Sequence, residues 1–267
     1  MNEIRIIDTH CHLDFKELKT RLDQVIKDAK INNVTEMVSI STNLSRIDPI
    51  KEISEKYEEV FFTVGVHPNE AHKDKQFDDY NFIKNYSKHL KCVGIGEGGL
   101  DYYYNKENME LQKRSLEVQI NVARTTNLPM IIHSREADKD MIEIIKSEYK
   151  NGPFKAILHC YSSGEALAYC GLDLDFFISF SGILTFNSAK NIQKIAKNIP
   201  LNKILVETDS PYLSPVPVRG SVNEPKNCFH TAKFLSKLRD VNFLELSEIL
   251  YNNSLVIYDK IKLWKDK

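Results

Sequence analysis

The chain has 267 residues, of which 42% are hydrophobic, and its 36 Lys and Arg residues nearly balance 37 Asp and Glu residues. This length suits one large α/β domain or two ordinary ones, and it allows a sizeable core. The net charge of -1 argues against a protein whose main task is to coat nucleic acid, because such binding depends on neutralising many phosphates.

The cysteines and the first residues indicate the compartment. The five cysteines are odd in number and scattered, without a Cys-x-x-Cys pair, which favours a reducing environment. Glu3 and Arg5 interrupt the first apolar stretch, so it does not resemble a signal peptide, and no apolar run is long enough to cross a bilayer. We expect a cytoplasmic protein with no membrane association and no obligate protein partner.

Eight short apolar or β-branched segments recur along the chain and are predicted to be strands. They cover residues 4–7, 36–40, 60–64, 92–95, 129–132, 155–158, 176–180 and 204–206. Intervening stretches such as 18–31 and 111–123 have helical spacing. Alternating strands and helices imply parallel pairing through right-handed crossovers. At this length the pattern predicts a (β/α)8 TIM barrel, with residues 1–267 as a single domain.

The end of the chain departs from this alternation. Residues 212–228 contain three prolines and no periodicity, so they are predicted to form a long loop after the last strand. Residues 229–238 and 243–257 are predicted to be two closing helices.

Directly after the first apolar run comes Asp8-Thr9-His10-Cys11-His12. Because side chains of a strand alternate, His10 and His12 are expected on one face, where two imidazoles form half of a metal site. The same alternation predicts Asp8 on their face, able to orient one ring, and Cys11 on the opposite face.

Polar residues also follow the other predicted strands. A parallel barrel gathers the carboxyl ends of its strands around one rim, where barrel enzymes have their active sites. Each residue has a structural alternative: a lone histidine can belong to the core, Asp209 can open a turn, and Glu97 can balance an arginine. Their joint placement favours a functional site formed by His10, His12, His67, Glu97, His133, Arg135, His159 and Asp209.

The run Gly94-Ile95-Gly96-Glu97-Gly98-Gly99 formally matches the dinucleotide-binding pattern G-x-G-x-x-G. That pattern requires a helix directly after the glycines, to hold the pyrophosphate. The following Leu100-Asp101-Tyr102-Tyr103-Tyr104 does not start a helix. The glycines are instead expected to let the backbone crowd around Glu97.

Taken together, these motifs resemble the TatD family of metal-dependent hydrolases in the amidohydrolase superfamily. The matching stretches begin at Ile7, Gly65, Gly94, Pro129, His159 and Glu207, and they span nearly the whole chain. The resemblance implies a one- or two-metal site and phosphodiester hydrolysis of DNA, typically as a magnesium-dependent exonuclease. It also implies a set of metal ligands, with Glu97 bridging: His10, His12, Glu97, His133, His159 and Asp209.

His67 and Arg135 match family positions near the substrate. The sequence departs from the family pattern at Asn69, at Gly98 and at Val222, which occupies the usual position of an arginine.

The residue types support this chemistry. Two divalent ions can activate a water and stabilise the attacking and leaving oxygens, with Asp209 as the base. Arg135 can bind a phosphate with two hydrogen bonds, and His67 can donate to the substrate. Imidazole ligands favour Zn²⁺ or Mn²⁺, whereas the resemblance suggests Mg²⁺.

The expected activity is therefore exonuclease cleavage of single-stranded DNA ends. The alternative is hydrolysis of an amide, a lactone or another small ester at the same metal site, and a non-catalytic barrel is a third reading.

Overall fold

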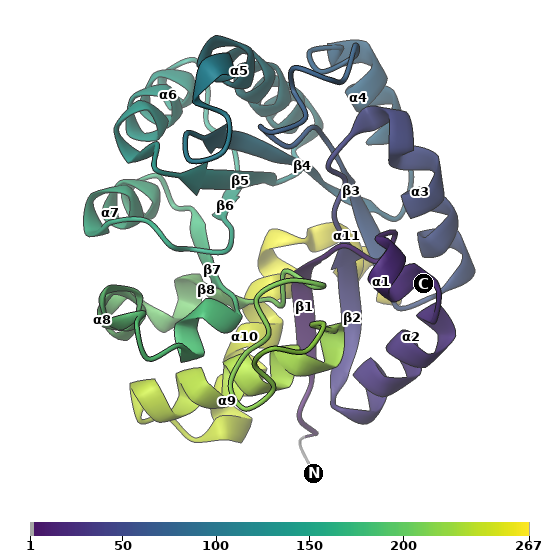
Figure 1. Cartoon of the computed structure of the whole chain (residues 1–267), viewed down its shortest axis with the longest axis vertical. Coiled ribbons are helices and arrows are strands. Elements are labelled where there is room, and N and C mark those ends of the chain that lie inside the picture. The colour runs from purple at the N-terminus through teal and green to yellow at the C-terminus, as the bar shows by residue number, and fades with distance from the viewer. Residues whose placement is uncertain (1–2, 267) are drawn as a thin grey trace.

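The computed structural model describes residues 3–266 and forms one eight-stranded parallel sheet with the strands in chain order (Figure 1). All eight predicted strands are present. Their bounds are β1 Ile6–Cys11, β2 Val34–Ser39, β3 Val60–Val64, β4 Cys92–Asp101, β5 Met130–Arg135, β6 Ala156–Leu158, β7 Phe177–Phe180 and β8 Ile204–Val206.

The sheet curls until β8 meets β1. Thr9 Oγ1 donates to the Val206 carbonyl at 3.0 Å, and the His12 N–H donates to the Ser210 carbonyl at 2.8 Å. The Asp209 N–H donates to the His10 carbonyl at 2.9 Å. The architecture is a nearly closed (β/α)8 TIM barrel, so the predicted fold is confirmed.

Helices surround the strands in a ring (Figure 1). Within residues 3–266, no helix is both long and apolar enough to span a membrane. The helices are α1 Lys16–Lys19, α2 Leu22–Ile31, α3 Ile47–Lys56, α4 Tyr80–Tyr86, α5 Met109–Thr126, α6 Asp138–Lys150, α7 Glu165–Asp173, α8 Lys190–Asn198, α9 Cys228–Arg239, α10 Phe243–Ile257 and α11 Asp259–Lys265.

The helices near the two ends of the chain differ in two respects from the sequence prediction. The stretch 18–31 is not one helix, because Arg21 leaves the helical region at φ -137° and separates α1 from α2. The two closing helices are present as α9 and α10, and a further helix, α11, follows them. The predicted loop 212–228 holds only one short 3-10 turn, Pro225–Asn227.

Asp8 does not have the role that simple alternation of side chains along β1 predicts. The pairing of β1 with β2 shifts between Asp8 and Cys11, so one extra residue intervenes. The Asp8 carboxylate accepts hydrogen bonds from the Thr208 N–H at 2.9 Å and from the Thr208 hydroxyl at 2.5 Å. Asp8 therefore ties β1 to the chain after β8 and does not orient an imidazole ring.

A separate apolar cluster fills the barrel interior below the rim, and α11 closes it at the amino-terminal ends of the strands. Tyr258 and Ile261 complete this cluster, and Trp264 packs against it. Lys260 fixes the helix, because its ammonium donates to three carbonyls at 2.9–3.1 Å, those of Ser87, His89 and Cys92. The cluster comprises Val38, Ile40, Phe61, Val93, Ile131, Ile157, Phe177, Leu205, Ile257, Tyr258 and Ile261.

We predict that Lys260→Met lowers the free energy of unfolding by about 2–4 kcal/mol, because three carbonyls lose a charged donor. Lys262→Met is the matched control, since Lys262 is exposed on the same helix, and it should change the value by less than about 0.5 kcal/mol. Urea denaturation followed by circular dichroism measures both. Equal effects of the two substitutions would show that the Lys260 contacts contribute nothing specific.

Candidate metal centre

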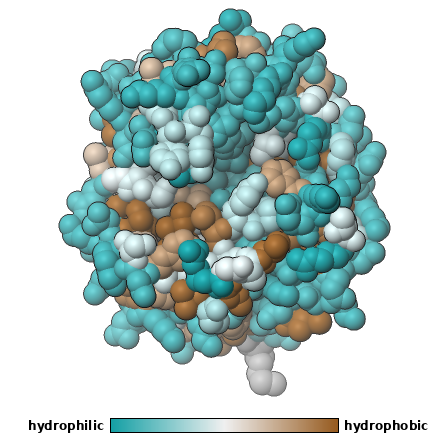
Figure 2. All heavy atoms as spheres, viewed as in Figure 1, coloured by the Kyte–Doolittle hydropathy of each residue, from teal (hydrophilic) through white to brown (hydrophobic). Residues whose placement is uncertain are grey.

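The polar residues predicted from the strand ends converge at one end of the barrel. His10 and His12 come from β1 and the residue after it, Glu97 from β4, and His133 from β5. His159 directly follows β6, and Asp209 lies three residues beyond β8. All of these residues except the fully buried His10 line a pocket of about 1620 Å³. Figure 2 shows this face hollowed near its centre, with hydrophobic residues along one side of the hollow.

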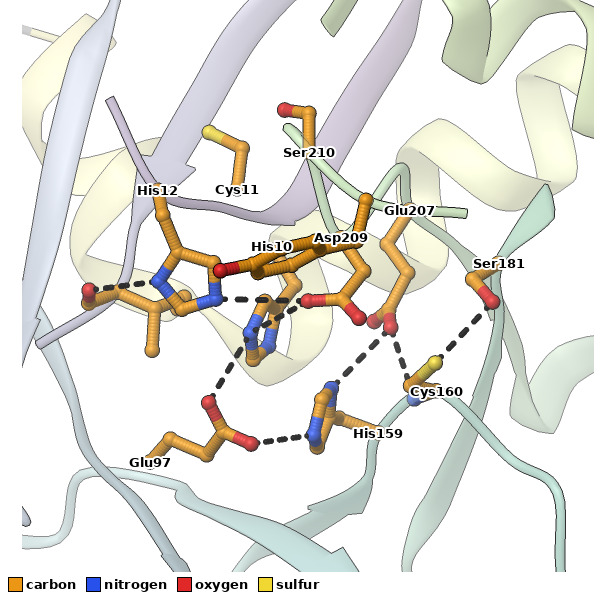
Figure 3. Close-up of polar contacts among 12 residues, drawn as sticks. His10, Cys11, His12, Glu97, His159, Cys160, Ser181, Glu207, Asp209 and Ser210 are labelled. Carbon is orange, nitrogen blue, oxygen red and sulfur yellow. Dashed lines mark hydrogen bonds and ion pairs between the residues drawn. The ribbon is translucent and has the colours of Figure 1, made fainter. Parts of the chain in front are cut away.

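Glu97 lies at the middle of the group and is 2% exposed. Its Oε2 lies 3.4 Å from His10 Nε2, while its Oε1 lies 2.7 Å from His159 Nε2 and 3.0 Å from His133 Nδ1. Figure 3 shows the carboxylate between His10 and His159. The two oxygens of Glu97 thus face two different sets of imidazoles. The sequence alternative, a nearby arginine as the partner of Glu97, is wrong.

The glycines of β4 make this placement sterically feasible. The register between β4 and β5 shifts between Ile95 and Gly98, so β4 bulges at Glu97. A Cβ on Gly98 would lie 2.5 Å from Gln119 Nε2, and one on Gly99 would lie 2.0 Å from the His133 carbonyl oxygen. The strand then continues to Asp101 without a helix, which excludes a dinucleotide-binding turn here.

His10, His12 and Asp209 form the other half of the group. Asp209 Oδ1 lies 3.4 Å from His12 Nε2 and 3.6 Å from His10 Nε2. The His10 and His12 rings meet edge to face at 5.1 Å. Both ring nitrogens of the buried His10 lack a hydrogen-bond partner. A buried imidazole that makes no hydrogen bond is costly unless a ligand such as a metal ion engages it. Cys11 points away from the group (Figure 3).

Hydrogen bonds behind three of the imidazoles fix which nitrogen faces the centre. His12 Nδ1 lies 3.2 Å from the Ile40 carbonyl, so it carries the proton and leaves the Nε2 lone pair towards Asp209. His159 Nδ1 lies 3.2 Å from Glu207 Oε1, which leaves its Nε2 towards Glu97. Such carbonyl and carboxylate partners are typical behind metal-bound histidines.

His133 shows the same arrangement with its two nitrogens exchanged. His133 Nε2 lies 3.2 Å from Asp101 Oδ2, so Nδ1 faces Glu97. Asp101 and Glu207 were not identified from the sequence as contributors to the site. Both are carboxylates close to a strand end, but their histidine partners lie 32 and 48 residues away in the chain.

His67 differs from these three histidines in that its protonated ring nitrogen faces the centre. Its Nδ1 accepts a hydrogen bond from the Asn69 N–H at 3.0 Å, so the proton of the neutral ring lies on Nε2. This Nε2 lies 3.5 Å from Glu97 Oε1. Burial lowers the pKa of His67 to about 4, which keeps the ring neutral at pH 7. His67 therefore presents an N–H donor to the centre and no lone pair.

Charge and burial set the protonation of the group. Burial alone raises the pKa of Glu97, but His159, His67 and His10 together hold it well below its usual range. The carboxylates Glu97 and Glu207 in turn raise the pKa of His159 in spite of its burial. Metal ions and protons therefore compete for these nitrogens, and metal binding releases protons.

The remaining residues of interest lie around the pocket. Arg135, at the end of β5, stacks on Tyr103 and Tyr104, with its guanidinium carbon 4.1 and 4.6 Å from the two ring centroids. Cys160 lines the pocket, and its Sγ lies 3.1 Å from Ser181 Oγ. Val222 is 45% exposed.

The donor groups fit divalent metal ions. Imidazole nitrogens and carboxylate oxygens are their usual ligands, and three sets here have their donor atoms within 4.8 Å of one another. The sets share Glu97 or His10 and are His10–Glu97–His159, His10–His12–Asp209 and His67–Glu97–His133. The His67 Nε2 proton makes this ring the least suited to bind a metal. Fold and site together define a barrel hydrolase that depends on metal.

Comparison with known proteins identifies the family. The family model described as "TatD related DNase" matches residues 7–259. The uncharacterized metal-dependent hydrolase YabD of Bacillus subtilis is 35% identical over 249 residues, which cover 93% of this chain and 97% of YabD. YcfH of Escherichia coli K12, with the same description, is 34% identical and covers 93% of each chain.

A solved structure shows the same fold. YJJV, a TatD homologue from Escherichia coli K12, superimposes with a TM-score of 0.89 at 24% identity and covers 96% of this chain and 98% of its own. The chain belongs to the TatD family of metal-dependent hydrolases, as the sequence motifs indicated.

We predict that Glu207→Gln weakens metal binding about 10- to 100-fold, because the amide no longer holds His159 in the tautomer that presents Nε2. Titration of the metal-free protein with Mn²⁺ or Zn²⁺ measures the dissociation constant. Glu107→Gln, at an exposed position, is the control and should leave it unchanged. An unaltered affinity in Glu207→Gln would contradict this role.

Proposed function

We propose that the protein is a divalent-metal-dependent nuclease that hydrolyses phosphodiester bonds of DNA from single-stranded ends. The observation that carries the proposal is the convergence of three features on one pocket. They are a two-sided carboxylate–imidazole group around Glu97, an imidazole N–H donor at His67 and the Arg135 guanidinium. Each of the three kinds of group can contribute to hydrolysis of a phosphodiester.

The proposal assigns two ions to the two sides of Glu97. His10, His12 and Asp209 would hold one, His133 and His159 would hold the other, and Glu97 lies between the two groups. Such a pair would supply activation of a water and stabilisation of the attacking and leaving oxygens. The resemblance favours Mg²⁺, and the many imidazoles suit Zn²⁺ or Mn²⁺.

The charges around the pocket give the ions a second role. Among the lining residues carboxylates outnumber cations: Glu70, Glu97, Glu136, Asp138, Glu165 and Asp209 against Arg46, Arg135 and Lys194. Bound divalent ions would add positive charge among these carboxylates and would favour an anionic substrate such as DNA.

Asp209 is proposed as the base. Burial raises its pKa, but hydrogen bonding to His12 and the charges of His10 and His12 lower it overall, so the carboxylate is ionised at pH 7. It lines the pocket and can accept the proton of the attacking water at a carboxylate oxygen.

His67 and Arg135 are proposed to bind the substrate. The Nε2–H of His67 can donate to a phosphoryl oxygen or to the leaving oxygen. Within residues 3–266 the Arg135 guanidinium has no carboxylate partner, and its N–H groups remain free for a phosphate. The match to the "TatD related DNase" model supports DNA as the substrate.

We predict that Asp209→Asn lowers kcat for a single-stranded oligonucleotide at least about 10³-fold and leaves the fold intact, because the amide cannot accept the proton. Cleavage of 5′- and 3′-labelled strands, with circular dichroism and metal content measured in parallel, checks this. Chelation of the wild-type protein should abolish cleavage, and added Mg²⁺, Mn²⁺ or Zn²⁺ should restore it.

Full activity in Asp209→Asn would remove Asp209 as the base. A wild-type protein that carries metal and cleaves no form of DNA, but hydrolyses an amide, a lactone or a small ester, would overturn the nuclease proposal in favour of that alternative.

We further predict that His67→Leu retains the metal content of the wild type and lowers kcat about 10²-fold, because it removes an N–H donor and no metal ligand. His133→Leu is the comparison, since its Nδ1 faces Glu97 and the substitution should reduce metal content. Elemental analysis of both purified variants measures this. Loss of metal from His67→Leu equal to that from His133→Leu would show that His67 binds the metal.

A further inference from the structure

Two large aromatic side chains are exposed beside the metal centre. Tyr103 and Tyr104 follow β4, are 54% and 68% exposed, and meet edge to face with their ring centroids 4.7 Å apart. Tyr104 and Arg135 both line the pocket that contains the centre. Exposed aromatic rings at the mouth of a pocket offer flat surfaces on which a planar group can stack.

The Arg135 guanidinium lies over both rings, which stand at 86° to each other. A guanidinium stacked on aromatic rings keeps its N–H groups at its edge, where they suit a phosphate. Arg135 has no ion-pair partner anywhere in residues 3–266, although the pocket is rich in carboxylates. The group therefore combines aromatic faces with an unpaired positive charge, the two features that bind a nucleotide of a single strand.

The turn that carries the tyrosines is fixed to the metal centre through one carboxylate. Asp101 Oδ1 accepts hydrogen bonds from the N–H groups of Tyr103 at 3.1 Å and Tyr104 at 2.9 Å. Its Oδ2 lies 3.2 Å from His133 Nε2. Asp101 therefore fixes the backbone of this turn relative to the candidate metal ligand His133, so both tyrosines extend from a defined position beside the centre.

We propose that Tyr103, Tyr104 and Arg135 form a stacking shelf that binds an unpaired nucleobase next to the scissile phosphate. The shelf requires a base that has left its duplex partner, because only an unstacked base exposes a face to the rings. It therefore selects frayed or single-stranded ends. This inference rests on the proposed nuclease function and adds the residues that determine its strand preference.

The test removes the Tyr104 ring by substitution and, separately, removes the base from the substrate with an abasic site. The enzyme is assayed on a single-stranded oligodeoxynucleotide and on the same strand with an abasic site at the nucleotide beside the cleaved bond. Tyr104→Leu should raise KM for the natural strand about 5- to 100-fold, the range expected for one stacked base. For the wild type, KM should be higher on the abasic strand than on the natural strand by a similar factor. For Tyr104→Leu, KM should be little higher on the abasic strand than on the natural strand.

Two variants serve as controls. Tyr104→Phe keeps the ring and should stay within about twofold of the wild type. Tyr169→Leu removes a tyrosine that is 48% exposed on α7 and does not line the pocket, and it should have no effect on either strand. The shelf would be overturned if Tyr104→Leu raised KM equally on the natural and abasic strands. It would also be overturned if Tyr104→Leu raised KM no more than Tyr169→Leu does.

Binding measurements separate this inference from the proposed function. Fluorescence anisotropy with the labelled natural and abasic strands, in the presence of Ca²⁺, reports affinity without requiring cleavage. If the wild type cleaves no DNA but binds the natural strand more tightly, and Tyr104→Leu abolishes that preference, the shelf stands and the nuclease proposal falls. If the wild type binds both strands equally, the shelf is overturned whatever the cleavage result.

Discussion

The site depends on one buried carboxylate. Glu97 is nearly inaccessible, and an isolated ionised carboxylate in such a position would be strongly disfavoured. Imidazoles from different strands surround it and hold its pKa well below its usual range. Because its two oxygens face different histidines, this one residue divides the group into two halves. The strands can close around it only because these charges offset one another.

Backbone geometry makes room for that carboxylate. A Cβ at Gly99 would lie 2.0 Å from the His133 carbonyl oxygen, so the bulge of β4 requires glycine there, and a Cβ at Gly98 would meet the side chain of Gln119. Gln119 itself donates to the Val66 carbonyl at 3.0 Å and accepts from the Val66 N–H at 3.1 Å. The contact links α5 to the segment that carries His67. The packing of α5 against the strands therefore also sets the positions of residues at the site.

A second set of groups decides what each imidazole can do. His12, His133 and His159 donate one N–H to a carbonyl or a carboxylate and direct the other nitrogen to the centre. His67 instead accepts from the Asn69 backbone and directs an N–H to the centre. Four similar side chains thus fall into two chemical classes: three present a nitrogen lone pair to the centre, and His67 presents an N–H donor. The backbone and carboxylate partners, not the histidines, make this distinction.

The sequence alone determined the eight strands, the barrel and the residues that meet at its rim. Apolar runs and the polar residues after them are local patterns, and a parallel barrel necessarily brings its strand ends together. The TatD family was also recognisable from these motifs. Only the tertiary structure decided that Asp8 binds Thr208, that Glu207 and Asp101 support His159 and His133, and that Arg135 stacks on Tyr103 and Tyr104. A bulge in β1 depends on how β2 pairs with it, and a tautomer depends on partners up to 48 residues away. Such contacts leave no periodic trace in the chain, because they arise only once the strands have closed.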